Sequence, residues 1–497
     1  MSFAVDAASA EEAARFLRRF PPFDELHGTV LGDIAAHVEL RAFPSGVDIL
    51  RQAAEPAHHL YLLRKGVVEL VEDGHLVDEL GEGELFGISV FSGLGPALTV
   101  RAREPVECYL IDPDRARMIM GTAAGLTFLA SHMSRWRERD QVEEHIRRAG
   151  VDDAILAEIG TAGDTPTLAA TSRRLPTMVT TLLERGVDPV DVGHVIGMTI
   201  DHLTMRLIQL VKDDRGEPPA AFAWVALGSA ARHEQALTTD QDHAIAYGDG
   251  TDPDEVDLYF AALAESVTAG LEACGIERCR GNVMAVNRAW RRTREGWRRR
   301  FGEYVADPDL MGARITGIAF DYRRVTGAVD VEATLNEAIR AAGTDRAFIR
   351  RLATTALETV PPVGRRHDIE VKRRGELGGR VDVKHEGITI VTNLARVCAI
   401  VAGSTQNRTI ERLRSAADAG LIPGRTRDDL IEAFGLLWRI RLERQAELRA
   451  RGERPDDFVD PTTLPRITER ALGGALRVIA DAQRHLAHDL GLTRRRG

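Results

Sequence analysis

The sequence predicts a multidomain α+β protein, and three observations carry this prediction. The chain has 497 residues, whereas a single hydrophobic core rarely serves more than about 250–300 residues. Short apolar runs separated by turn residues fill the first part, a pattern typical of a small β-roll. Further along, two apolar runs flank a Gly-Ser pair and an Asp-x-Asp motif, and the last third carries apolar residues at helical spacing. We expect a β-roll with flanking helices (1–125), a helical connector (126–215), a mixed domain (216–345) and a helical bundle (346–497).

The composition narrows the class of protein. Apolar residues make up 44%, charged residues 28%, and the net charge is −10, as in ordinary globular proteins. No apolar run is long enough to span a bilayer, and the start of the chain has no signal-peptide pattern, so we expect a cytoplasmic protein with no membrane partner. The acidic balance argues against nucleic acid as the main partner. The four cysteines form no CxxC pair and are expected to be reduced thiols.

The first domain resembles the cyclic-nucleotide-binding domain through the order YLLRKGVVEL, GEGELFGISVFSG, LTVRARE and then a helix from Pro113. Strands are expected at 38–43, 47–50, 59–63, 67–72, 76–80 and 98–103.

This domain departs from the family where the ligand would bind. The family holds the cyclic phosphate and ribose with an acid just after Phe-Gly and an arginine shortly before the Thr-Val strand. Here Ile88 and Ser89 stand at the first place and Pro96 at the second, and proline supplies neither a charge nor an N–H group. Arg101 and Arg103 either substitute for the missing arginine or lie on a solvated strand face. We expect weak or no binding of cyclic AMP, and either another ligand or a partner.

The connector is expected to be helical. Its apolar residues recur at helical spacing over 168–210, with breaks at Pro176 and at Gly186–Pro189. The turn Gly216–Pro219 leads into the mixed domain.

The mixed domain holds the candidate site. Phe222–Leu227 is expected to be a buried strand that ends at Gly228, and Ala244–Tyr247 a second strand. Gly228 and Ser229, at a strand-to-helix turn, offer backbone N–H groups and a hydroxyl to a phosphate.

Asp240 and Asp242 are the candidate metal ligands. Alternate residues of a strand face the same side, so these two carboxylates are expected to point together. They repel each other unless a divalent cation neutralises them, and Mg²⁺ prefers such hard oxygen ligands. A lone Asp-x-Asp more often marks a solvated strand end, but the preceding Gly-Ser turn and both flanking strands favour the metal site.

A strand, Gly-Ser, a short helix and Asp-x-Asp together resemble the nucleotidyltransferases of the polymerase-β type. The fuller string GSAARHEQALTTDQD resembles the signal-transduction nucleotidyltransferases related to the uridylyltransferase of bacterial nitrogen regulation. The resemblance implies Mg²⁺-dependent transfer of UMP or AMP from a nucleoside triphosphate to an acceptor hydroxyl, expected on a regulatory protein, under control of the first domain. It implies that Gly228 and Ser229 hold the β/γ-phosphates and that Arg232 stabilises charge on the leaving pyrophosphate.

The third carboxylate of such a site is not obvious in this chain. The family's pattern places Cys279 at that position. Glu277, two residues earlier on the same strand face, is the nearest replacement, and we expect it to complete the catalytic set with Asp240 and Asp242, because a soft thiolate is a poor Mg²⁺ ligand. The alternative for Glu277 is a surface strand residue.

Two further segments of this domain carry charge. Arg288–Phe301 is expected to form one basic helix with Trp290 and Trp297 on one face. Its arginines either contact phosphate or RNA or are solvated while the tryptophans pack inward, and we favour the second interpretation. Asp321 and Arg323, in FDYRRVTG, are expected to form a structural ion pair near a helix end.

The last domain contains GELGGRVDVKHEGITIVTNLAR, which resembles the segment after the catalytic domain in uridylyl- and adenylyltransferases. The resemblance implies that Gly378 and Gly379 turn the chain, that Asp382 enters the cleft, and that Lys384 reaches a triphosphate; a surface lysine is the alternative. Later residues expected to line the same cleft are Arg396, Asn407, Arg408 and Arg412. Long amphipathic helices are expected at Arg427–Ala450 and Leu464–Leu490.

Two alternatives to an active transferase stay open. One is a catalytically inactive nucleotide-binding signalling protein, which the missing third carboxylate favours. The other, a nucleic-acid enzyme of the tRNA-adding kind, rests on the basic segment alone. The oligomeric state stays open too, with a homodimer as one alternative.

Overall fold

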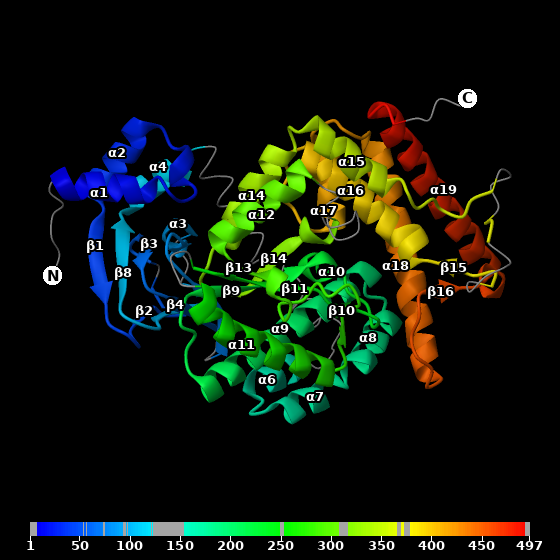
Figure 1. Ribbon diagram of the computed structural model, residues 1–497, viewed down its shortest axis with the longest axis horizontal. Coiled ribbons are helices and arrows are strands. Elements are labelled where there is room, and N and C mark those ends of the chain that lie inside the picture. Colours follow the sequence, from blue (N-terminus) through cyan, green and yellow to red (C-terminus); the bar gives the residue numbers. More distant parts are fainter. Residues whose placement is uncertain are drawn as a thin grey trace.

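The computed structural model describes residues 7–52, 54–55, 57–72, 75–92, 96, 98–120, 122, 154–248, 253–307, 317–364, 369–371 and 378–492. A β-rich N-terminal domain lies at one end, a mixed domain in the middle, and a set of long helices at the other end (Figure 1). The predicted multidomain α+β class is confirmed. No helix of the described residues is long and apolar enough to cross a membrane.

The N-terminal domain is the predicted β-roll. Its two four-stranded sheets have the orders β1-β8-β3-β6 and β2-β7-β4-β5. Leu60 and Leu62 on β3 pack toward the helices, whereas Tyr61 and Leu63 pack toward the second sheet, as strand alternation requires. The strands are β1 (Glu39–Phe43), β2 (Asp48–Leu50), β3 (Leu60–Lys65), β4 (Val68–Glu72), β5 (His75–Leu80), β6 (Leu85–Phe86), β7 (Thr99–Ala102) and β8 (Val106–Ile111); the helices are α1 (Ala7–Leu17), the turn Phe23–Glu25, α2 (Gly28–His37), α3 (Ser89–Ser92) and α4 (Pro113–Met120).

The connector is helical over its described residues. Its helices are α6 (Ala154–Thr161), α7 (Thr165–Ser172), α8 (Leu175–Glu184) and α9 (Pro189–Arg215). The predicted break at Gly186–Pro189 separates α8 from α9, where Asp188 caps α9 by accepting from the Val190 N–H at 2.8 Å. Pro176 sits in the first turn of α8, so the break falls just before it, because a proline fits the start of a helix but not its interior.

A four-stranded sheet of order β13-β11-β9-β14 forms the centre of the mixed domain. Its strands are β9 (Phe222–Leu227), β11 (His243–Tyr247), β13 (Arg291–Thr293) and β14 (Tyr322–Gly327), and β9 runs antiparallel to both neighbours. Helices cover both faces. Phe222 and Trp224 pack into the core formed with α9 and α11 (Pro253–Ala273), and Val225 and Leu227 into the core formed with α12 (Arg294–Ala306) and α14 (Val331–Ala342). Double coverage explains why β9 is apolar at every position.

The predicted basic helix over Arg288–Phe301 is wrong in form. The segment begins as a 3₁₀ turn (Arg288–Trp290), continues as β13, and becomes helical only at Arg294. Trp290 and Trp297 are nevertheless both buried, and the Trp297 indole N–H donates to the Ile245 carbonyl at 3.0 Å. The inward packing of the two tryptophans is therefore confirmed. The solvation of the arginines is not confirmed throughout, because Arg291 is buried and donates to Asp257 at 2.9 Å.

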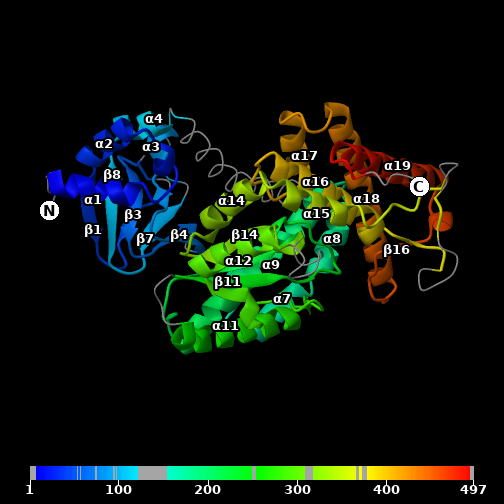
Figure 2. The same cartoon turned by 45° about the horizontal axis from the view of Figure 1, so that its top comes forward.

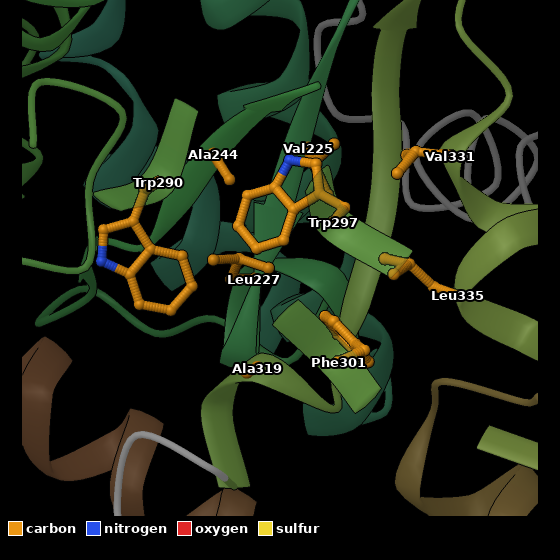
Figure 3. A pocket seen from close by; sticks show the side chains of 9 residues that line it. All are labelled: Val225, Leu227, Ala244, Trp290, Trp297, Phe301, Ala319, Val331 and Leu335. Atoms are coloured by element: carbon orange, nitrogen blue, oxygen red, sulfur yellow. The ribbon is translucent and has the colours of Figure 1, made fainter. Parts of the chain in front are cut away.

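A small apolar void lies beside these rings, under the sheet (Figure 3). Its volume is about 10 Å³, roughly the space of one water, and an apolar lining of this size offers no site for a polar ligand. Its walls are Val225, Leu227, Ala244, Trp290, Trp297, Phe301, Ala319, Val331 and Leu335.

The C-terminal domain is a helical bundle, as predicted. Its helices are α15 (Arg346–Ala356), a π-helical turn (Lys384–Ile388), α16 (Thr389–Val401), α17 (Thr409–Asp418), α18 (Gly424–Ala450) and α19 (Arg466–Asp489), with the 3₁₀ turn Pro461–Thr463 and a short ribbon of β15 (Val381–Asp382) and β16 (Phe458–Val459). The two long helices predicted from periodicity correspond to α18 and α19, which pack against each other (Figure 2).

Buried ion pairs join the N-terminal domain to the mixed domain and to the connector. Both guanidinium NH₂ groups of Arg324 on β14 donate to the Glu84 carboxylate, at 2.6 and 2.9 Å. Lys212 near the end of α9 donates to Glu79 at 3.2 Å. The backbones also approach closely, because a Cβ on Gly81 would stand 2.0 Å from the Ala328 carbonyl oxygen.

Candidate active site

The turn after β9 is built around a glycine. Gly228 has φ +57° and opens the short helix α10 (Gly228–Ala231), and a Cβ at this position would stand 3.1 Å from an oxygen of Asp242. Glycine is strongly favoured here, because it adopts this backbone conformation without strain and leaves room for the Asp242 oxygen. The Gly228 N–H is already engaged, since it donates to the Asp321 carbonyl at 2.9 Å. Among the described residues the Ser229 hydroxyl makes no hydrogen bond, so Ser229 is the residue of this pair with a free donor.

Asp240 and Asp242 lie one pleat apart where β10 (Asp240–Gln241) leads into β11. Gln241, between them, points to the other side and donates to the carbonyls of Thr268 and Ile276 at 3.1 and 2.8 Å. This anchor fixes which face the two carboxylates occupy. Ligand atoms of Asp240, Asp242 and Cys279 all lie within 4.8 Å of one another.

Asp242 is a buried carboxylate without a matching cation. Its residue is 9% exposed, and its Oδ1 has no hydrogen-bond partner among the described residues. Burial and then the charge of Asp240 raise its pKa to about 7, against smaller lowering effects of the Cys279 thiol, Lys384 and Arg232. A buried carboxylate normally has a partner. Two convergent carboxylates with one orphaned oxygen therefore fit a divalent cation.

The prediction that Glu277 completes this set is wrong, because the Glu277 side chain points away from the two aspartates. Glu277 sits beside Asp240 in the parallel pairing of β10 with β12 (Glu277–Arg278), but its side chain is exposed and forms an ion pair with Arg454. Cys279, one pleat further on, comes beside Asp242 instead. The thiol is protonated in the absence of a metal, because burial and the neighbouring carboxylates raise its pKa to about 12.

Arg232, expected to face the pyrophosphate, is buried in ion pairs. Its Nε donates to Glu234 at 2.7 Å and its NH₂ group pairs with Asp321. Asp321 is fully buried and also receives Arg396 at 2.5 Å and Arg412 at 2.6 Å. These three guanidiniums hold the pKa of Asp321 well below its usual range, against the effect of burial. Arg396 and Arg412 thus fasten the C-terminal domain to the mixed domain.

Asp321 and Arg323 do not pair with each other, contrary to the prediction. Each has other partners, since Asp321 is held by three arginines, whereas Arg323 donates to Asp201 on α9 at 2.9 Å and to the carbonyls of Ala230 and Ala231 at 3.1 and 3.3 Å. His233, at φ +52°, donates its Nε2–H to the same Asp201 carboxylate at 2.8 Å. This clamp holds the end of α10, and no sequence signal beyond the His itself pointed to it.

Lys384, in the C-terminal domain, lies close enough to Asp240 and Asp242 to interact with their charges. Burial and then Arg441 lower its pKa, whereas Asp457, Asp240 and Asp382 act in the opposite direction. Asp382 itself caps the turn before α16 by accepting from the His385 N–H at 2.9 Å. Asp382 therefore has a structural role, and its charge also acts to raise the pKa of Lys384.

The remaining predicted cleft residues bind protein groups. The Asn407 side chain donates to the Tyr322 carbonyl at 2.9 Å, and Arg408 lies 3.9 Å from Asp191. With Arg396 and Arg412 they connect domains rather than line an open cleft. Gly378 and Gly379, at φ +52° and +88°, form the predicted turn.

In the N-terminal domain the two arginines considered as replacements for the missing one are paired. Arg101 donates to Asp48 at 2.7 Å, and Arg103 donates to Glu79 at 2.8 Å. Ser89 accepts from the Ala57 N–H at 3.2 Å, and Pro96 is buried. The residues described here offer a phosphate no unpaired arginine from β7.

Three family models match the chain in order. The cyclic nucleotide-binding domain matches residues 40–122, "Putative nucleotidyltransferase DUF294" matches 173–310, and "Putative nucleotidyltransferase substrate binding domain" matches 346–490. No curated protein matches the chain.

Three solved structures that are similar to the chain each cover about a quarter of it. A cyclic nucleotide-binding protein of Geobacter metallireducens GS-15 is 29% identical, covers 24% of this chain and 90% of its own, and has a TM-score of 0.22. The regulatory subunit of a cAMP-independent protein kinase A from Trypanosoma brucei is 22% identical over 26% of this chain and 48% of its own, with a TM-score of 0.23. The sensor domain of the transcriptional regulator DNR from Pseudomonas aeruginosa is 22% identical over 24% and 91%, with a TM-score of 0.22.

Proposed function

Because the chain carries a cyclic nucleotide-binding domain, a nucleotidyltransferase domain of the DUF294 type and that family's substrate-binding domain, we propose that it is an active, divalent-cation-dependent nucleotidyltransferase. It moves UMP or AMP from a nucleoside triphosphate to a hydroxyl of an acceptor, which we take to be a regulatory protein. The observation that carries this proposal is the buried, unpartnered Oδ1 of Asp242 beside Asp240 and the Gly228 turn.

The chain's own residues have separate tasks in this reaction. Asp240 and Asp242 would hold the cation, which the fold family suggests is Mg²⁺ and which would neutralise charge on the triphosphate. The Ser229 hydroxyl orients a phosphate, and Lys384 supplies the positive charge that Arg232, held by Glu234 and Asp321, does not.

The acceptor oxygen forms a bond to the α-phosphorus while the bond from that phosphorus to the pyrophosphate oxygen breaks. The acceptor proton passes to solvent, and pyrophosphate leaves with the electron pair. Positioning and charge neutralisation carry the rate in such transfers, which matches a site that brings two convergent carboxylates and the half-buried Lys384 together.

The test incubates the full chain with each α-labelled nucleoside triphosphate, MgCl₂ or MnCl₂, and cell extract as the source of acceptor. We expect label to move to a macromolecule with one preferred triphosphate. Asp240→Ala and Asp242→Ala should each lower transfer by orders of magnitude.

Glu277→Gln is the matched control, because it removes a neighbouring carboxylate that pairs with Arg454 instead of facing the cluster. Wild-type activity in either aspartate variant would refute the mechanism. Loss of activity in Glu277→Gln as large as in Asp242→Ala would restore Glu277 to the catalytic set.

The second candidate is a catalytically inactive nucleotide-binding protein. Cys279 in place of a third carboxylate favours it. Tight binding of a nucleoside triphosphate with no transfer and no hydrolysis, under any divalent cation, would establish this alternative.

We further propose that the N-terminal domain controls the transferase through its buried ion pairs. Arg324, held by Glu84, is the neighbour of Arg323, which with Asp201 clamps the end of α10. A shift of Glu84 would therefore act on β14 close to the turn that carries Ser229.

Arg324→Gln tests this control. We expect a several-fold change of basal transfer, since a charge left in a buried pair disturbs both domains, whereas Arg101→Gln, which breaks a pair inside the N-terminal domain, should leave transfer unchanged. Identical transfer rates of wild type and Arg324→Gln, with melting curves showing both folded, would exclude this route.

A further inference from the structure

The third position of the carboxylate cluster is a thiol, and this changes the kind of cation that fits. The ligand atoms of Asp240, Asp242 and Cys279 lie within 4.8 Å of one another. That is about the span of two ligands that each stand roughly 2.0–2.3 Å from one ion. Glu277, the nearest further carboxylate on the same strand, is drawn away by Arg454.

A second, independent feature shows that this cluster is built for a ligand. Asp242 is 9% exposed, and its Oδ1 is buried without a hydrogen-bond partner in the described part of the chain. The nearby cations do not satisfy it, because Arg232 is held by Glu234 and Asp321. Gly228 leaves the space beside the other Asp242 oxygen open, where any Cβ would stand at 3.1 Å.

We propose that Cys279 is a direct ligand of the divalent cation held by Asp240 and Asp242, and that it makes the site select Mn²⁺, Co²⁺ or Zn²⁺ over Mg²⁺. The inference rests on the proposed function in one respect, namely that the aspartates bind a divalent cation. It adds the sulfur ligand and the resulting selectivity.

The chemistry of the ligand set supports this selectivity. Mg²⁺ takes oxygen ligands in near-ideal octahedral geometry and dehydrates reluctantly, so a sulfur in its shell is unfavourable. First-row transition metals and zinc accept thiolate, and their affinity for mixed sites rises from Mn²⁺ through Co²⁺. On binding, the thiol gives its proton to solvent and the sulfur lone pair forms the bond to the metal.

The test titrates the full chain, stripped of metal by a chelator, with CoCl₂. We expect one tight site that shows a sulfur-to-cobalt charge-transfer band in the near ultraviolet. Cys279→Ser should lose this band and bind Co²⁺ roughly tenfold to a hundredfold more weakly, while Cys398→Ala, which changes a buried thiol on α16, keeps both.

Calorimetric titration with MgCl₂ and MnCl₂ measures the selectivity of the site between the two cations. Wild type should bind Mn²⁺ at least about tenfold more tightly than Mg²⁺, and Cys279→Asp, which supplies a third carboxylate, should reduce this ratio by about tenfold by gaining Mg²⁺ affinity.

The outcomes separate this proposal from the proposed function. If Co²⁺ binding depends on Asp242 but shows no charge-transfer band, and Cys279→Ser binds it as tightly as wild type, the sulfur ligand is refuted while the metal site stands. If no divalent cation binds in a manner that Asp242→Ala abolishes, both are refuted. Equal Mg²⁺ and Mn²⁺ affinity in wild type also overturns the selectivity.

Discussion

Asp321 and Asp242 are both buried carboxylates of the same domain, yet their surroundings are opposite. Asp321 receives Arg232, Arg396 and Arg412, and its pKa lies well below the usual range. Asp242 faces a second carboxylate and a thiol, one of its oxygens has no partner in the described structure, and its pKa rises to about 7. Both residues border the Gly228 turn, since the Asp321 backbone carbonyl accepts the Gly228 N–H and an Asp242 carboxylate oxygen lies 3.1 Å from where a Cβ on Gly228 would stand.

The difference separates a buried charge that the protein neutralises from one that has no cation partner in the described structure. A buried charge that the protein neutralises internally fixes the relative position of elements, here β14, α16 and α17. A buried charge without a partner lowers the stability of the ligand-free protein. Such a charge is typical of a site where a ligand of opposite charge binds and neutralises it. The perturbed pKa values point in opposite directions for this reason.

The largest effect on stability is expected at Asp321, the carboxylate that three arginines hold. Asp321→Asn leaves three buried guanidiniums around a neutral group, so we expect a loss of about 3–5 kcal/mol in the free energy of unfolding. Thermal melting and limited proteolysis between the mixed and C-terminal domains measure it. Asp307→Asn, at an exposed pair with Arg351, is the control and should change stability by less than about 1 kcal/mol. A similar small change at Asp321 would break the contrast between the two carboxylates.

At Asp242, the carboxylate without a cation partner in the described structure, we expect a substitution to increase stability rather than decrease it. The folded-state pKa of Asp242, about 7, exceeds the ordinary value of 3.8, so its ionisation opposes folding above about pH 4 and does so fully above about pH 7. Asp242→Asn should therefore raise the melting temperature at pH 8 in a chelator, by the equivalent of up to a few kcal/mol, and leave it unchanged at pH 4. Added MnCl₂ should stabilise wild type and not the variant. A lower melting temperature of Asp242→Asn at pH 8 without metal would contradict this account.

The smallest effect, weak or absent binding of cyclic AMP, is expected in the N-terminal domain, where the contrast between paired and unpaired charges applies to arginines. Arg101 and Arg103 are paired with Asp48 and Glu79, and Pro96 stands at the place expected for a phosphate-binding arginine. A charged hydrogen bond to phosphate is worth a few kcal/mol, roughly a hundredfold in affinity. Calorimetry with cyclic AMP should detect no binding at micromolar ligand. A micromolar dissociation constant would show that paired arginines can still be recruited.

Much of the fold follows from local patterns. Features that depend only on residues close in sequence could be predicted. They are the apolar run of β9 and the glycine that ends it, the alternation that sets Asp240 and Asp242 on one face, and the periodicity of α18 and α19. Where the prediction failed, the structure depends on distant partners. Arg291–Thr293 is helical by propensity and composition, yet it becomes strand β13 because the edge of β11 offers it a parallel ladder.

The sequence by itself determined the order of the domains, the Gly-Ser turn and the shared face of the two aspartates, because these follow from the chain's local periodicity and from its turn residues. The tertiary structure alone decided which charges are free. Glu277 and Cys279 lie on one strand, two residues apart, and only the position of Arg454, 177 residues later, turns the carboxylate outward and leaves the thiol beside Asp242. Arg232 follows the Gly-Ser turn as a phosphate ligand would, but Asp321 and Glu234 occupy it. Coulombic attraction acts between groups that are close in space, and spatial proximity between distant residues is set by packing, which sequence periodicity does not encode.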